Sequence, residues 1–245
     1  MSTIQVQDDN GVRIITFNRP DKRNALNLQM YIKLTEYLIQ GESDNEIQAF
    51  MLRGQAQCFT SGNDIADFLT NSDLGADHPA FKFLLCLLDL TKPIVAAVTG
   101  PAIGIGTTML LHCDMIYADN TAKFQLPFVQ LALVPEAAAS LLLPHAIGHA
   151  KAAELLMLGD SFNASAALQY GLINDVINSE DIFSYTLKQA KRLAQQPPIS
   201  LQTTKKLMRY NKESIRKQMK KEQIEFAIRL ASDEAKTRFA AFLKR

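Results

Sequence analysis

The residues that can do chemistry gather in residues 92–136, where a glycine-rich turn is followed by one isolated carboxylate, Glu136. The turn, at residues 100–106, comes after a short apolar run at residues 94–98 that is typical of a buried strand. A mostly apolar run of helical length, residues 107–112, comes next. Backbone N–H groups at the start of a helix attract negative charge. The segment therefore predicts a place where an electron-rich atom is held near a single acid.

A second small-residue turn, at residues 54–65, follows another strand candidate at residues 49–53. Turns at the ends of neighbouring strands can converge, and two N–H groups about 3 Å from one oxygen stabilise negative charge there. Acyl-thioester chemistry needs this arrangement, because removing a proton beside a thioester leaves charge on the carbonyl oxygen. The alternative interpretation is two unrelated loops, since a strand, a glycine turn and a helix also occur in ordinary α/β packing.

Four sequence blocks, in this order, resemble the crotonase (enoyl-CoA hydratase/isomerase) superfamily, and the resemblance covers nearly the whole chain. The blocks are residues 18–27, residues 59–65, residues 92–106 with residues 113–118, and residues 164–177. The resemblance implies an α/β protein with the crotonase (ClpP/crotonase-like) fold, in which repeated ββα units form the core and a helical C-terminal region follows. It also implies that Asn63 and Ile105 supply the two oxyanion N–H donors.

The acid/base groups decide which reaction such an oxyanion hole serves. Hydratases of this superfamily carry two glutamates, and the corresponding positions here hold Thr108 and Phe128. Neither side chain exchanges a proton with water at neutral pH, whereas hydration needs an activated water and a proton delivered to carbon. This departure argues against an efficient hydratase, although the hydroxyls of Thr107 and Thr108 can still orient a water molecule.

Glu136 suits an isomerase instead. Residues 135–137, like residues 61–65, resemble the Δ3,Δ2-enoyl-CoA isomerases of the peroxisomal type, in which one glutamate removes a proton from C2 and returns it at C4. The apolar neighbours of Glu136 disfavour a charged carboxylate and are expected to raise its pKa. A glutamate that only stabilises a helix N-terminus is the alternative role.

The resemblance also implies contacts with the substrate and its coenzyme A moiety. They are expected at Lys22, Arg23, Ala25, Leu26, Ser61, Gly62, Asp64, Ile65, Gly104 and Phe239. The two cations in this set are alternatively solvated loop residues. Residues 66–79 form a polar stretch of a kind that often covers an active site. Phe68, Phe81, Phe83 and Leu84 are candidates for an acyl tunnel, with ordinary core packing as the alternative.

The length of 245 residues suffices for one substantial core. A hydrophobic content of 47% and a net charge of +1 predict an ordinary soluble protein. Residues 1–10 are polar and no apolar run is long enough to span a membrane, so neither a secretory leader nor a membrane segment is expected. Cys58, Cys86 and Cys113 are odd in number and widely spaced, which is typical of free thiols in a reducing compartment such as the cytoplasm. No metal site is expected, and coenzyme A enters as part of the substrate rather than as a cofactor.

Charge is divided unevenly along the chain. Residues 1–187 carry 10 Lys/Arg against 20 Asp/Glu, whereas residues 188–245 carry 16 against 5. Such asymmetry can signal nucleic acid, but apolar residues at helical spacing favour solvated faces of amphipathic helices, and no nucleic-acid partner is expected. We therefore expect a coenzyme A-binding and catalytic core at residues 1–187 and a helical region at residues 188–245. The resemblance implies that this region covers the pocket, brings Phe239, Phe242 and Lys244 toward the coenzyme, and joins subunits into a homotrimer or a dimer of trimers.

Local patterns predict the elements around the site. A hairpin is expected between residues 4–6 and residues 12–17, and Asn27 is expected to cap a helix that ends near residue 39. Further helices are predicted at residues 81–90, 150–158 and 164–170, and extended chain at residues 172–177. Together with the blocks above, the sequence predicts an enoyl-CoA isomerase of fatty acid β-oxidation that shifts a 3-enoyl-CoA double bond to the 2-trans position. The rivals are a hydratase or hydrolase of the same fold, and an inactive acyl-CoA-binding protein.

Overall fold

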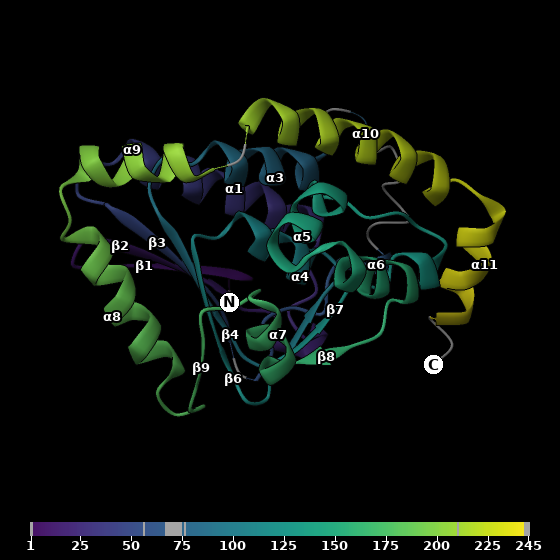
Figure 1. Ribbon diagram of the computed structural model, residues 1–245, viewed down its shortest axis with the longest axis horizontal. Helices are drawn as coiled ribbons and strands as arrows, with labels where there is room; N and C mark the ends of the chain where they lie inside the picture. Colours follow the sequence, from purple (N-terminus) through teal and green to yellow (C-terminus); the bar gives the residue numbers. More distant parts are fainter. Residues whose placement is uncertain (1, 56, 67–74, 76, 210, 243–245) are drawn as a thin grey trace.

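A six-stranded sheet forms the centre of the computed structural model, which describes residues 2–55, 57–66, 75, 77–209 and 211–242 (Figure 1). Its strands, in spatial order, are β1 (Ile4–Asp9), β2 (Val12–Phe17), β3 (Ala49–Gly54), β4 (Ile94–Val98), β6 (Met115–Asp119) and β9 (Asp175–Ile177). β1 and β2 are antiparallel, and every later neighbouring pair in this sheet is parallel. A second, three-stranded sheet contains β5 (Pro101–Ile103), β7 (Lys123–Gln125) and β8 (Phe162–Asn163).

Helices surround both sheets. They are α1 (Leu28–Ser43), α3 (Pro79–Asp89), α4 (Ile105–Thr108), α5 (Ala139–Ile147), α6 (His149–Leu158), α7 (Ala164–Tyr170), α8 (Ile182–Ala194), α9 (Pro198–Met208), α10 (Lys212–Leu230) and α11 (Asp233–Phe242). Short 3-10 turns lie at Pro20–Lys22, Met109–His112 and Val129–Leu131. α3, α6 and α7 lie close to their predicted bounds. The helix predicted at residues 107–112 is divided between α4 and the 3-10 turn that follows it.

The N-terminal hairpin forms where the sequence predicts it. Asn10 and Gly11 have φ values of 49° and 82°, which suit the left-handed residues of a two-residue hairpin turn. The antiparallel register begins at once, with Asp9 opposite Val12. β1 therefore continues to Asp9, beyond the predicted residues 4–6.

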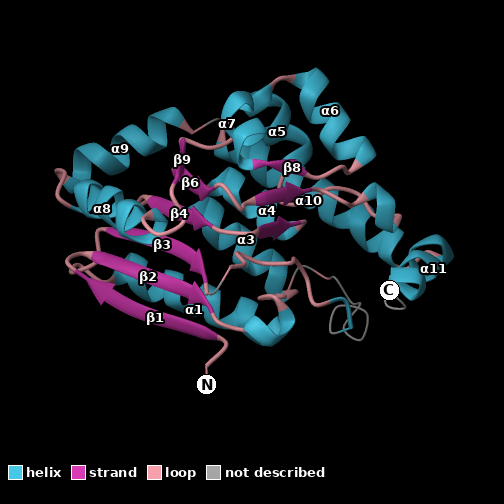
Figure 2. Cartoon of the chain, turned by 90° about the horizontal axis from the view of Figure 1, so that it is seen from below, coloured by secondary structure: helices cyan, strands magenta, loops and turns pink. Residues whose placement is uncertain are grey.

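The strands β3 and β4 are buried on both faces, as the continuous apolar run of β4 predicts. On one face, Phe50 and Ala96 belong to the main core, which also includes side chains of α1 and α3. On the other face, Met51 and Val95 belong to a cluster with residues of α8. Figure 2 shows the strands β1 to β4 between α1 and α8. The boundary expected after residue 187 falls within α8, which packs on the sheet.

Asn27 begins α1, as predicted, because its side chain accepts a hydrogen bond from the Met30 N–H at 3.0 Å. The helix runs to Ser43, past its predicted end near residue 39. Tyr37 is only half-buried. The buried residues of this helix are Met30, Tyr31, Leu34, Leu38 and Gly41.

The C-terminal helices α9, α10 and α11 follow one another along one side of the molecule (Figure 1). α10 packs against α3 and α5, and α11 packs against the 3-10 turn Val129–Leu131. Within the residues that the structure describes, no helix is both long and apolar enough to cross a bilayer. The C-terminal region thus lies beside the segments that surround the candidate site.

Candidate active site

The two glycine-containing turns lie side by side, as the sequence predicts. Thr60 and Ala102 form a parallel bridge, in which the Thr60 N–H donates to Pro101 O at 2.9 Å and the Ile103 N–H donates to Thr60 O at 3.1 Å. The backbones approach closely, because a Cβ atom added at Gly106 would lie 2.7 Å from Thr60 Cγ2. Glycine is therefore required where the second turn enters α4.

Two backbone N–H groups in these turns, those of Asn63 and Ile105, have no hydrogen-bond acceptor among the residues that the structure describes. Asn63 pairs with Leu26 as a parallel bridge, but the bonds run through Gly62 O and the Asp64 N–H. Ile105 is the first residue of α4, where a helix provides no acceptor for the amide. Within the described part of the chain, neither the Asn63 nor the Ile105 N–H donates to another group, so both remain available to a ligand oxygen.

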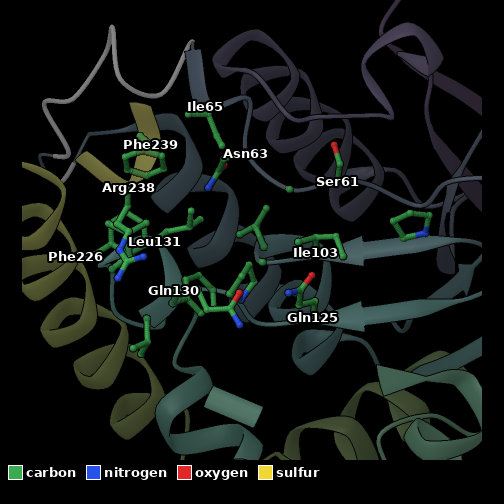
Figure 3. A pocket seen from close by; sticks show the side chains of 18 of the residues that line it. Ser61, Asn63, Ile65, Ile103, Gln125, Gln130, Leu131, Phe226, Arg238 and Phe239 are labelled. Atoms are coloured by element: carbon green, nitrogen blue, oxygen red, sulfur yellow. The ribbon is translucent and has the colours of Figure 1, made fainter. Parts of the chain in front are cut away.

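These donors line a cavity of about 860 Å³. Figure 3 shows opposite sides of it, with Arg238, Phe239 and Phe226 from the C-terminal helices on one side and Ser61, Ile103 and Gln125 on the other. The predicted residues that line the cavity are Arg23, Ser61, Gly62, Asn63, Ile65, Gly104, Ile105 and Phe239. The cavity therefore joins the two turns to the C-terminal helices.

The other predicted binding residues do not line this cavity. Asp64 pairs with Arg19 at 2.6 Å, which ties its carboxylate to the loop before α1. Leu26 is 1% exposed and is held by the bridge to Asn63. Lys22 ends an exposed 3-10 turn, and Ala25 is half-buried, its carbonyl accepting from the Arg19 guanidinium at 3.1 Å. Direct substrate contact at these four positions stays a prediction.

Glu136 is almost completely buried, with 5% of its surface exposed. The Thr108 hydroxyl donates to Glu136 Oε1 at 2.5 Å. Thr108 comes three residues after Ile105 in α4, and helical side chains lean back toward the preceding turn, so this hydrogen bond brings the carboxyl close to the Ile105 end of the helix. Among the described residues, Leu133 lines the cavity and Glu136 does not.

The surroundings of Glu136 raise its pKa from an ordinary value of 4.5 to about 8. Burial is the largest cause, the hydrogen bond from Thr108 opposes it, and the negative charge of Glu222 adds to it. A carboxyl of this kind holds a proton at neutral pH and releases it slightly above neutrality. It can therefore both accept and return a proton near physiological pH.

The predicted alternative role of Glu136, stabilisation of a helix N-terminus, falls to another residue. The first amides of α5 are bound by Glu222 of α10, whose Oε2 accepts from the Ala138 N–H at 2.6 Å and whose Oε1 accepts from the Ser140 N–H at 3.0 Å. The Glu136 side chain turns instead to Thr108. The geometry thus separates a capping carboxylate, Glu222, from a buried acid, Glu136, that is bonded to Thr108 of α4.

Comparison with known proteins identifies the family and the fold of this chain. A sequence profile described as Enoyl-CoA hydratase/isomerase matches residues 7–245. The chain belongs to the enoyl-CoA hydratase/isomerase family. A solved structure of an enoyl-CoA hydratase/isomerase from Pseudoalteromonas atlantica T6c superposes with a TM-score of 0.95 at 41% identity, covering 99% of this chain and 97% of that one. The predicted crotonase fold and superfamily membership are confirmed.

Curated relatives in the enoyl-CoA hydratase/isomerase family differ in the reaction that they catalyse. The chain is 34% identical to the enoyl-CoA delta isomerase 2 of Rattus norvegicus over 99% of its own length, but it spans only 63% of that relative. It is 30% identical to the 2,3-dehydroadipyl-CoA hydratase of Escherichia coli K12, covering 100% of this chain and 97% of that protein. The comparisons therefore show the enzyme family of this chain, and that family includes both an isomerase and a hydratase.

Tyr31 belongs to the site although the sequence-based prediction did not include it. Its hydroxyl donates to the side-chain oxygen of Asn63, and its ring packs against Phe83 with centroids 5.7 Å apart. Burial raises the pKa of Tyr31 well above its usual value, and the charge of Glu136 raises it further. The spacing of Tyr31, Leu34 and Leu38 was the available signal, because it places the phenol on the buried face of α1.

The acyl-tunnel candidates in α3 lie in the core instead. Phe81, Phe83 and Leu84 are buried, and among the described residues none of the three lines the cavity. These three side chains pack in the core, which was the alternative interpretation given for them above. Phe68 and most of the polar stretch at residues 66–79 lie outside the described residues, as do the Phe242 side chain and Lys244.

Proposed function

We propose that the protein is an enoyl-CoA isomerase that moves the double bond of a 3-enoyl-CoA to the 2-trans position. The observation that supports this most strongly is the buried carboxyl of Glu136, whose pKa is raised to about 8 and which is bonded to Thr108, in the short helix whose first N–H, that of Ile105, has no acceptor among the described residues. One acid is sufficient for this reaction, because the proton that leaves C2 is the proton that C4 requires.

The proposed mechanism has two proton transfers. The thioester oxygen accepts hydrogen bonds from the N–H groups of Asn63 and Ile105, and the Glu136 carboxylate takes a proton from C2. The electron pair of the broken C–H bond moves into a dienolate whose charge rests on the thioester oxygen, where the two N–H groups stabilise it. Protonated Glu136 then delivers the proton to C4, and the electrons return to form the C2–C3 double bond. Burial of Glu136 limits loss of this proton to water.

The cavity suits a substrate with an anionic and an apolar part. Arg23 and Arg238 supply two guanidinium groups, which suit the phosphates of a coenzyme A moiety. Phe226, Phe239 and Leu131 supply apolar surface beside Arg238 (Figure 3). The proposal calls for no cofactor besides the coenzyme A that the substrate carries.

Hydration is the second candidate, because relatives at similar identity are named hydratases. Thr108 and Phe128 stand where the superfamily hydratases carry glutamates, and here Thr108 donates to Glu136 while Phe128 forms part of the cavity wall. A second carboxyl, Glu222, is close enough for its charge to influence Glu136. Both of its oxygens accept hydrogen bonds from Ala138 and Ser140, so it is not free to activate a water. This arrangement favours isomerisation.

The test is a product assay with 3-hexenoyl-CoA in water enriched in oxygen-18. We expect 2-trans-hexenoyl-CoA without the heavy isotope. Glu136→Gln is expected to abolish this conversion while leaving acyl-CoA affinity nearly unchanged, and Glu225→Gln, an exposed change in α10, serves as the control. A labelled 3-hydroxyacyl-CoA, a labelled free acid, binding of acyl-CoA without conversion, or an unchanged rate in Glu136→Gln would each refute the proposal.

A further inference from the structure

Glu222 is a carboxylate in the apolar face of α10. The buried positions of this helix are Ile215, Met219, Glu222, Phe226 and Leu230, which recur at helical spacing toward the core. Glu222 is 6% exposed, and burial raises its pKa to about 7 against the opposing hydrogen bonds from Ser140, Ala138 and Gln218. A charged side chain in such a stripe is costly unless it is well bonded, so its contacts indicate its role.

The carboxylate of Glu222 is bonded mainly to the segment that directly follows Glu136. One oxygen accepts from the Ala138 N–H at 2.6 Å, and the other accepts from the Ser140 N–H at 3.0 Å and the Ser140 hydroxyl at 2.5 Å. Gln218, one turn earlier in α10, donates to the Ser140 hydroxyl oxygen at 2.8 Å. The Ala138 N–H, the Ser140 N–H and the Ser140 hydroxyl all donate to Glu222, which favours its ionised form at the start of α5.

The backbone held by these bonds is unusual. Ala137 and Ala138 have φ values of 62° and 57°, in the left-handed region that alanine seldom adopts. Such a conformation persists only where its surroundings impose it. On the other side, the ring of His112 bonds Ala137 O at 2.8 Å, and burial lowers the pKa of His112 to about 4, so the neutral ring donates from Nε2. His112 and Glu222 therefore hold the turn from two directions.

We propose that Glu222 is a positioning residue, which holds the turn at residues 137–140 so that the Glu136 side chain faces Thr108 and the oxyanion donors. The inference rests on the proposed role of Glu136 as the base. It makes α10 part of the catalytic arrangement, because this helix also supplies Phe226 to the cavity wall. Correct packing of the C-terminal region and correct placement of the base then occur together.

The kinetic test compares Glu222→Ala and Glu222→Gln with wild type and with Glu225→Ala. Alanine removes all three hydrogen bonds, so kcat should fall about 10- to 100-fold while KM changes little, as expected when a base is displaced and the binding surface is kept. Glutamine keeps the shape of the side chain and part of the accepting capacity, and should recover part of the rate. Glu225→Ala, an exposed change one turn away, should match wild type. An unchanged kcat in Glu222→Ala, or equal changes in kcat and KM, would overturn the proposal.

A crystal structure of Glu222→Ala separates this inference from the proposed function, since it needs no turnover. We expect Ala137 and Ala138 to leave the left-handed region and the bond between Thr108 and Glu136 to break. If wild type shows no isomerase activity but the turn moves in this variant, the function is wrong and the positioning role stands. If the turn keeps its geometry, the positioning role is wrong. Should the alanine variant not fold, the same two measurements on Glu222→Gln decide the question, with a smaller displacement expected.

Discussion

Replacing Glu136 by glutamine should stabilise the protein increasingly as the pH rises. The pKa of Glu136 is about 8 in the folded chain and is expected near the ordinary 4.5 in the unfolded chain. Between these values the folded state keeps its proton while the unfolded state releases it, so the free energy of unfolding falls with rising pH. Below pH 4.5 both states are protonated and the carboxyl causes no such difference.

The size of this effect follows from the two pKa values. A difference between 4.5 and about 8 corresponds to roughly 5 kcal/mol in the free energy of unfolding once the pH exceeds both. Over the accessible range from about pH 5.5 to 7.5, wild type should lose about 1.4 kcal/mol of stability per pH unit through this group. Glu136→Gln keeps the shape of the neutral acid and has no proton to lose, so its advantage over wild type should grow at that slope.

Urea unfolding of both proteins at a series of pH values measures this difference directly. Titrating groups that do not interact with Glu136 contribute equally to both proteins, and Glu225→Gln, an exposed change of the same kind, should show no comparable trend. A difference between Glu136→Gln and wild type that stays constant with pH would refute the inferred environment of Glu136, and with it the basis for proton exchange near neutrality.

Three further predictions concern the same site. Ile105→Pro removes one oxyanion N–H at the first position of α4, where proline fits a helix. Turnover should fall by about 10²-fold or more with little change in the circular dichroism spectrum, and full activity would exclude this donor. Thr108→Val removes the hydrogen bond that lowers the pKa of Glu136, so the rise of kcat/KM with pH should move to higher pH, and an unmoved profile would contradict the bond. Gly106→Ala places a Cβ 2.7 Å from Thr60 Cγ2 and should lower both Tm and activity, and an unchanged Tm would show that the two turns can separate.

Local patterns made much of the fold and part of the site predictable. The apolar run of β4, the Asn27 cap and the two glycine turns each depend on neighbouring residues, and the structure has them where the sequence indicates. Features that depend on distant partners were not predictable in this way. The ion pair between the carboxylate of Asp64 and Arg19, 45 residues earlier in the chain, is one such feature, and substrate contact at Asp64 stays a prediction.

Glu222 shows the same limit. Its partner amide at Ala138 is 84 residues away, and only the fold brings α10 against the start of α5. The sequence does contain a weak signal, because Glu222 falls on the stripe formed by Met219 and Phe226. An acid among apolar residues at helical spacing must find buried donors, which is a reason to examine such positions in related sequences.

The central claim is that one buried acid moves a proton along an acyl chain whose carbonyl is held by two backbone amides. A crystal structure with a bound 3-enoyl-CoA analogue that cannot react tests it most directly, through the distances from the Glu136 carboxyl oxygens to C2 and C4. The account predicts that one carboxyl oxygen lies roughly 3 to 3.5 Å from both carbons, with the thioester oxygen bonded to the Asn63 and Ile105 N–H groups. A bound ligand whose acyl carbons stay out of reach of Glu136, while that carboxyl remains enclosed beside Thr108, would contradict it.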